Sequence, residues 1–258
     1  MRICPSRISG IKLSSFTNNN KALSFAYIWK HLSVKTLQQS LYPYISNLAI
    51  ALCFLPFILL WWRKISKEKS FLFVGIYWLA NGLLNLPNWI GQANNSSLQS
   101  EVTLCYNLLD APLAILVFYS ASQGMKRKIL LYLMIGFILF EMVVIKWKGH
   151  NFDSSTVIIG GSTLIALLFS LWGIAEYFNK IEHTYFEHAM GFIYAGFLFN
   201  YGPFILIYIY SYLNKSTGTT TEANFFLYYL SLLSATLLTT VGIWRYGRPA
   251  LLPLRAPA

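Results

Sequence analysis

Seven long apolar stretches constrain the fold of this chain more than any other feature. Each is about 20 residues long, the length of helix that crosses a hydrocarbon layer of about 30 Å. Apolar and polar residues do not alternate in them as in the strands of membrane β-barrels, so each backbone is expected to form its hydrogen bonds within a helix. The stretches are residues 43–62, 71–91, 103–122, 129–147, 157–178, 189–212 and 225–244.

The composition supports a membrane protein. Of the 258 residues, 56% are hydrophobic and only 11% are charged, whereas a soluble domain has about 25% charged residues. We therefore predict an all-α polytopic integral membrane protein, a seven-transmembrane-helix bundle. The bundle is expected to span residues 43–247, between a basic polar tail at 1–42 and a proline-rich tail at 248–258.

The formal charge of +11 is concentrated in alternate loops. By the positive-inside rule the basic loops are cytoplasmic, so we expect an outside N-terminus and a cytoplasmic C-terminus, in a plasma membrane or a bacterial inner membrane. The N-terminal tail is also basic, which leaves a flipped topology as the alternative. The basic loops and C-terminal end contain Arg63, Lys64, Lys67, Lys69, Lys126, Arg127, Lys128, Lys180, Arg245, Arg248 and Arg255, and the opposite loops contain Lys146, Lys148 and Lys215.

Two acidic residues lie inside apolar stretches, each within about 5 Å of the centre of its stretch. They are Asp110 and Glu141, and no basic residue lies at their depth. Inserting such a group costs about 2.5–3.5 kcal/mol, so it is interpreted as a functional site that is protonated or binds a cation. The alternative is that both acids fasten helices together through hydrogen bonds worth about 0.6 kcal/mol each.

Asparagines accompany these acids. Asn81, Asn85 and Asn88 are spaced i, i+4, i+7, which puts their amides on one helix face that lipid cannot satisfy. Asn107 is a candidate hydrogen-bond partner of Asp110, and Asn200 lies at the centre of the sixth stretch. Three residues later, Pro203 removes a backbone donor and is expected to provide a hinge.

These residues predict a polar pocket open to the outside that binds a small molecule or cation. The protein would be a sensor or receptor, or a proton- or cation-linked transporter. Asp110 would be the anchor and Glu141 its partner, with amides of Asn81, Asn85, Asn107 and Asn200 around the ligand.

The alternative function is a non-catalytic structural or accessory subunit of a larger membrane complex. The basic tail would then contact other subunits or anionic lipid. An enzyme is the weakest interpretation, because no nucleophile, metal set or phosphate cradle accompanies the acids. The expected partner is the lipid bilayer rather than nucleic acid, and no cofactor is indicated.

His183 and Glu187 are the only weak metal candidates, spaced i, i+4 at the start of the sixth stretch. Zinc sites need three or four protein ligands, so further residues would have to join them. The simpler interpretation is an acidic first helical turn that is stabilised by the helix macrodipole.

Overall fold

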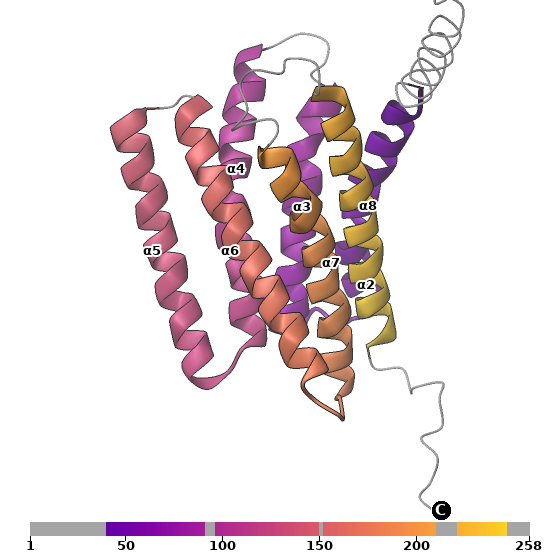
Figure 1. Ribbon diagram of the computed structural model, residues 1–258. Coiled ribbons are helices and arrows are strands. Elements are labelled where there is room, and N and C mark those ends of the chain that lie inside the picture. Colours follow the sequence, from indigo (N-terminus) through magenta and orange to yellow (C-terminus); the bar gives the residue numbers. More distant parts are fainter. Residues whose placement is uncertain (1–39, 91–95, 150–151, 210–220, 247–258) are drawn as a thin grey trace, which may run out of the picture. The chain divides into compact units, whose positions relative to one another are not determined.

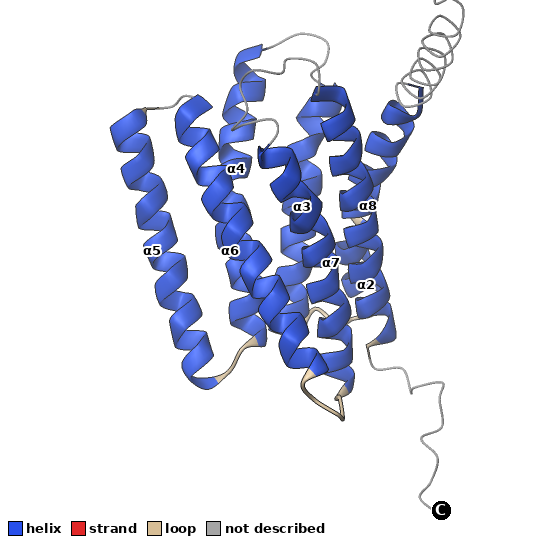
Figure 2. Cartoon of the chain, viewed as in Figure 1, coloured by secondary structure: helices blue, strands red, loops and turns tan. Residues whose placement is uncertain are grey.

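The computed structural model describes residues 40–90, 96–149, 152–209 and 221–246, and only the backbone of residues 87–90, 96–104, 152 and 221–224. The chain divides into two units, Met1–Leu41 and Tyr42–Ala258, and almost all described residues belong to the second. This part of the chain consists of helices and short loops, with no strand among the described residues (Figure 2). The predicted all-α membrane bundle is confirmed.

The described residues form seven helical segments (Figure 1). The first is Ser40–Trp62, whose second half is α2 (Leu55–Trp62). A turn at Phe54 separates the two halves, next to Pro56, which has no amide hydrogen to donate. The others are α3 (Lys69–Ile90), α4 (Ser96–Ala121), α5 (Gly124–Lys148), α6 (Phe152–Phe178), α7 (Tyr185–Tyr208) and α8 (Thr221–Arg245).

Helices α4 and α6 begin before the predicted residues 103 and 157, at Ser96 and Phe152. The additional turns contain polar residues, which suits turns that lie beyond the hydrocarbon, in the interfacial region of the membrane. The predictions located the apolar parts of these helices and not their full lengths.

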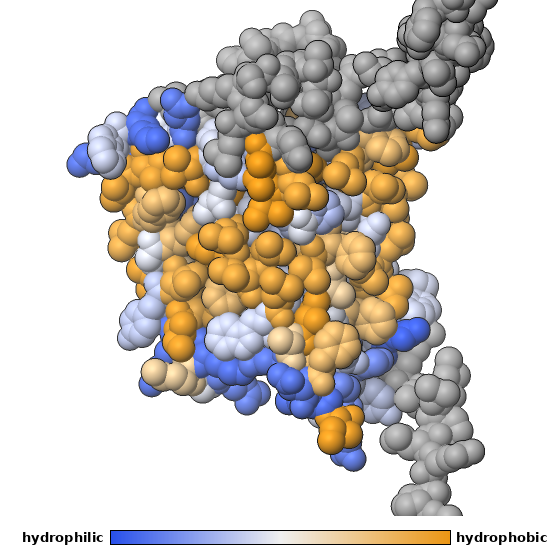
Figure 3. Space-filling view, viewed as in Figure 1, coloured by the Kyte–Doolittle hydropathy of each residue, from blue (hydrophilic) through white to orange (hydrophobic). Residues whose placement is uncertain are grey.

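On the face shown in Figure 3, apolar side chains form a broad belt, and hydrophilic side chains gather at the lower end. Among the described residues, five helices are long and apolar enough to cross a membrane. They are Ser40–Trp62, Gly124–Lys148, Asp153–Phe178, Tyr185–Tyr208 and Phe225–Arg245. Helix α4 has a shorter apolar segment, Cys105–Ala121. Asn81 and Asn85 lie on α3, and Asn107 and Asp110 lie on α4.

The helices form a closed ring in which sequence neighbours pack together and α2 returns to α8. Helix α4 contacts both α5 and α6, so it lies deepest on that side of the ring. Helix α5 is peripheral, because only 22% of its apolar segment is buried, whereas 44% is buried in α7 and in α8. Groups on α3, α4 and α7 can therefore meet inside the ring, while most of α5 faces outward.

Helices α7 and α8 pack closely at two glycines. A Cβ atom added at Gly196 would lie 2.8 Å from the carbonyl oxygen of Ala235, and one at Gly242 would lie 2.7 Å from that of Ala189. Only residues without a Cβ allow such an approach, which is typical of tightly packed membrane helices.

One end of the bundle contains the loops α2–α3, α4–α5 and α6–α7 and the last residue of α8 (Figure 1). We call it the basic end, because Lys64, Lys126, Lys180 and Arg245 lie there. Nη1 of Arg63 donates hydrogen bonds at this end to the carbonyl oxygens of Ile243 (2.9 Å) and Trp244 (2.7 Å). The guanidinium thus satisfies terminal carbonyls of α8 and joins the first and last helices.

Candidate functional site

The Asp110 side chain lies inside the ring of helices and the residue is only 8% exposed. The hydroxyl of Tyr201 on α7 donates a hydrogen bond of 2.7 Å to its Oδ1 atom. The hydroxyl of Tyr77 on α3 approaches the same oxygen at 3.4 Å. No basic side chain forms an ion pair with Asp110 in the part of the chain that the structure describes. The carboxyl group is thus held by neutral hydroxyl groups from two other helices.

These bonds form a chain that leads to Asp110. The hydroxyl oxygens of Tyr77 and Tyr201 are 2.9 Å apart, and Nδ2 of Asn200 donates to the hydroxyl of Tyr77 at 3.2 Å. Each tyrosine has a single hydroxyl hydrogen, and Tyr201 uses its own on Asp110. Asn200 therefore donates to Tyr77, Tyr77 donates to Tyr201, and Tyr201 donates to Oδ1 of Asp110. In such a chain each hydrogen bond strengthens the next. We call Tyr77, Asp110, Asn200 and Tyr201 the Asp110 network.

The helix α3 amides lie beside this network. Asn81 and Asn85 are both buried, as the spacing predicts for an inward face. Their Nδ2 atoms donate back to their own helix, to the carbonyl oxygens of Tyr77 (3.1 Å) and Asn81 (2.8 Å). Oδ1 of Asn81 accepts a bond of 3.0 Å from the hydroxyl of Tyr106 on α4. The third predicted amide, Asn88, lies outside the residues whose side chains are described.

A small void of about 10 Å³ adjoins Asp110. It is about the size that one water molecule needs. Nδ2 of Asn107 and Oδ1 of Asn200 belong to lining residues and have no hydrogen-bond partner among the described residues. A donor and an acceptor are thus available where a single water molecule or a small cation fits. The void is lined by Tyr106, Asn107, Asp110, Ile159, Ser162, Asn200, Tyr201, Phe204 and Tyr228.

Glu141 occupies a separate position on α5. The residue is 4% exposed, and its Oε1 atom has no hydrogen-bond partner in the described part of the chain. It does not line the void beside Asp110, and no hydrogen bond joins the two acids. Glu141 is therefore not hydrogen-bonded to the Asp110 network among the described contacts, and burial without a partner is costly for a carboxyl group.

Aromatic rings fill the bundle between the Asp110 network and the basic end. The ring of Phe197 lies 4.6 Å from that of Tyr77 and 5.4 Å from that of Phe118. Phe118 in turn stacks on Tyr194 at 5.4 Å. Tyr194 borders a second cavity of about 670 Å³, which lies at the basic end. We call Phe118, Tyr194 and Phe197 the aromatic layer, and it separates this cavity from Asp110.

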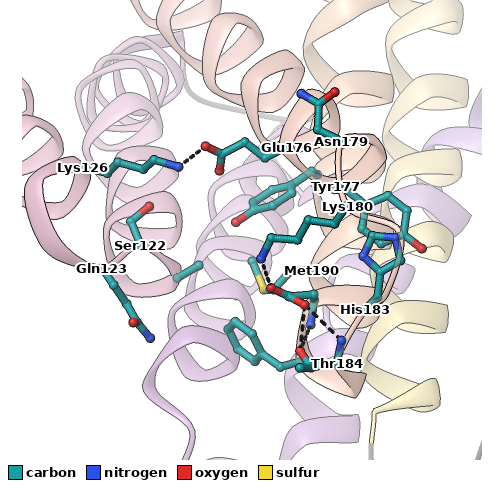
Figure 4. Close-up of a pocket in the computed structure, with 15 residues that line it drawn as sticks. Ser122, Gln123, Lys126, Glu176, Tyr177, Asn179, Lys180, His183, Thr184 and Met190 are labelled. Atoms are coloured by element: carbon teal, nitrogen blue, oxygen red, sulfur yellow. Dashed lines mark hydrogen bonds and ion pairs between the residues drawn. The ribbon is translucent and has the colours of Figure 1, made fainter.

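The weak metal candidates both border the cavity at the basic end (Figure 4). The His183 ring stacks on Tyr177 with a centroid distance of 3.9 Å. Glu187 accepts from the backbone amide of Thr184 in a capping box and forms an ion pair with Lys180. The described residues contain no group of three or more metal-ligand side chains. Glu187 thus caps the first turn of α7, as expected for an acidic residue at the start of a helix.

The sequence interpretation did not identify the tyrosines of the site. Tyr77 and Tyr201 bond Asp110, while Tyr106 bonds Asn81 and lies 3.5 Å from the hydroxyl of Tyr228. A signal existed for Tyr77, because it precedes Asn81 by four residues and so continues the asparagine face. For the other three, only the packing of the helices shows which hydroxyl groups point inward.

The structure thus gathers Asp110, Asn107 and Asn200 around one void, with Asn81 close by through Tyr106. Pro203 lies within α7, which continues as a helix on both sides of it. No protein-family model, no curated protein and no solved structure matches this chain.

Proposed function

We propose that this integral membrane protein binds a proton or a small monovalent cation at Asp110, as a cation-linked transporter or sensor. One observation carries the proposal: a buried carboxyl group that forms no ion pair with any described residue is surrounded by polar groups from α3, α4 and α7. Keeping an acid inside a membrane is expensive, and such residues usually mark a proton or ion pathway.

The chemistry of the lining supports a cation rather than an organic molecule. Carboxylate, hydroxyl and amide oxygens are the atoms that hard cations prefer. Asn200 lines the same small void, and its Oδ1 atom has no hydrogen-bond partner among the described residues. Sites for organic ligands usually measure about 300–1,000 Å³, far more than the 10 Å³ beside Asp110.

The aromatic layer supports access from one side of the membrane at a time. Phe118, Tyr194 and Phe197 lie between Asp110 and the basic end. With the N-terminus outside, the basic end is cytoplasmic, so Asp110 would exchange its cation with the outside in this conformation. Pro203 cannot donate to the carbonyl of Phe199, and this missing bond would let α7 bend next to Asn200 and Tyr201.

Flux measurements on the purified full-length protein in proteoliposomes test the proposal. The vesicles contain a pH-sensitive dye, and separate experiments impose gradients of H⁺, Na⁺ or K⁺. Asp110→Asn keeps a carbonyl oxygen that can accept from Tyr201 but removes the charge, and we expect it to reduce flux at least about tenfold. Asp153→Asn, at the exposed first turn of α6, is the matched control and should leave flux unchanged.

Undiminished flux in correctly folded Asp110→Asn protein would contradict the proposal. A wild-type protein without flux that purifies in fixed ratio with another polypeptide would instead favour the accessory-subunit alternative.

A further inference from the structure

The cavity at the basic end is distinct from the Asp110 network and has a different chemistry. It measures about 670 Å³ and lies between the end of α4, the start of α5, the end of α6 and the start of α7. Figure 4 shows the side chains of Lys126 and Glu176 turned toward each other across it, with Lys180 beside them. The aromatic layer closes its inner side, with Tyr194 as the shared residue.

The ionisable side chains at the cavity form two ion pairs. Lys126 of α5 pairs with Glu176 of α6, and Lys180 pairs with Glu187 of α7 (Figure 4). The four side chains are 30–55% exposed, so solvent reaches both pairs. Such exposed pairs are worth at most about 1 kcal/mol, so a ligand with matching charges could exchange partners with them. Two cations and two anions leave these four groups with no net charge.

The inner surface of the cavity is apolar and aromatic. It contains Phe186, Met190 and Tyr194, and Gly173 makes room for the tyrosine ring. A Cβ atom at Gly173 would lie 2.6 Å from the Tyr194 ring. The nine helical steps from Tyr185 to Tyr194 correspond to a depth of about 14 Å along α7. The cavity therefore combines a charged mouth with an apolar wall that extends into the bundle.

The mouth of the cavity lies where lipid headgroups are expected. Helix α6 ends at Phe178 and α7 begins at Tyr185, so the charged residues lie at the helix ends. Nε1 of Trp172 donates to Glu176 at 2.9 Å, and Lys126 lies 5.6 Å from the centre of the Trp172 ring. Tryptophan with a polar tip and an apolar body is typical of the membrane interface.

We propose that this cavity binds the headgroup of a zwitterionic phospholipid, a phosphate diester that carries an ammonium group. The phosphate lies against Lys126 and Lys180, and the ammonium lies against Glu176 and Glu187. The glycerol region rests on the apolar wall. Such a headgroup gives each of the four side chains a contact of opposite charge and leaves the site neutral as a whole. An anionic headgroup would occupy the lysines and leave the two glutamates unpaired beside it, which disfavours it.

Native mass spectrometry of the delipidated full-length protein tests this proposal. Phosphatidylethanolamine and phosphatidylglycerol with identical acyl chains are titrated separately, and free phosphoethanolamine is added as a competitor. We expect phosphatidylethanolamine to bind at least about tenfold more tightly. Equal or tighter binding of phosphatidylglycerol would overturn the proposal. Displacement by equimolar phosphoethanolamine would overturn its lipid part, because the ligand would then be a soluble phosphate ester of ethanolamine.

Variants locate the site. Lys126→Gln and Glu176→Gln should each weaken phosphatidylethanolamine binding about tenfold, since each removes one charged contact. Lys128→Gln removes a charge two residues along α5, outside the cavity lining, and should change nothing. Unchanged binding in both cavity variants would contradict the location. The titration of the wild-type protein decides the lipid class even if a variant fails to fold.

Discussion

Tyr201 on α7 donates a hydrogen bond of 2.7 Å to Oδ1 of Asp110 on α4, inside the bundle. This contact joins a buried carboxyl group to a neutral donor rather than to a cation. The acid therefore keeps the capacity to bind a positive charge. Because Tyr77 reaches the same oxygen, α3, α4 and α7 are held together at one point.

Tyr201→Phe tests how much this contact contributes to stability. The change removes the donor to Asp110 and one neighbour of the Tyr77 hydroxyl, so we expect a loss of about 1–3 kcal/mol. Thermal unfolding of the detergent-solubilised protein measures it. Tyr132→Phe on α5, where the side chain is 73% exposed, is the control and should be neutral. Equal stability of both variants would mean that the Asp110 bond contributes nothing.

Glu141→Leu separates function from packing on α5. Because Oε1 of Glu141 is buried and has no partner among the described residues, leucine should raise stability by about 1–2 kcal/mol. If Glu141 assists cation movement to Asp110, the same variant should lose flux in proteoliposomes. A stabilised variant with normal flux would remove Glu141 from the proposed pathway, and a destabilised variant would point to a structural role.

Gly196→Leu tests the close contact of α7 and α8. An added Cβ would meet the Ala235 carbonyl oxygen at 2.8 Å, so the helices must separate, at a cost of about 1–3 kcal/mol or more. Gly136→Leu on α5 is the matched control, because nothing lies within 4 Å of its Cβ position. The control should be neutral or slightly stabilising, since leucine favours helix more than glycine does. Comparable losses for both variants would contradict the packing.

Labelling of single cysteines tests the orientation. The native cysteines are replaced by alanine, and Lys148→Cys or Lys128→Cys is added at opposite ends of α5. With the N-terminus outside, an impermeant maleimide should label Lys148→Cys in intact cells and Lys128→Cys only after permeabilisation. The reverse pattern would establish the flipped topology and place Asp110 in the cytoplasmic half of the membrane.

The candidate site was only partly predictable from sequence. Asp110 and the amide of Asn81 were identifiable because polar groups stand out in an apolar stretch, and their spacing gave the helix face. The pairing of Asp110 with tyrosines was not, because a tyrosine in a membrane helix can equally well face lipid near the interface or the interior. For Glu141, the sequence indicated a depth in the membrane similar to that of Asp110. It did not indicate that the helix of Glu141, α5, lies at the periphery of the bundle.

The sequence by itself determined that this protein lies in a lipid bilayer, that its backbone is helical, and how deep each polar residue is expected to lie. These follow from local quantities, namely the length and hydropathy of each stretch and the rise of a helix per residue. Only the tertiary structure decided which polar groups meet, because that depends on how each helix is rotated about its axis and on which helices are neighbours. Both are set by side-chain packing between distant segments, such as the approach of α7 to α8 at Gly196, which no single stretch encodes.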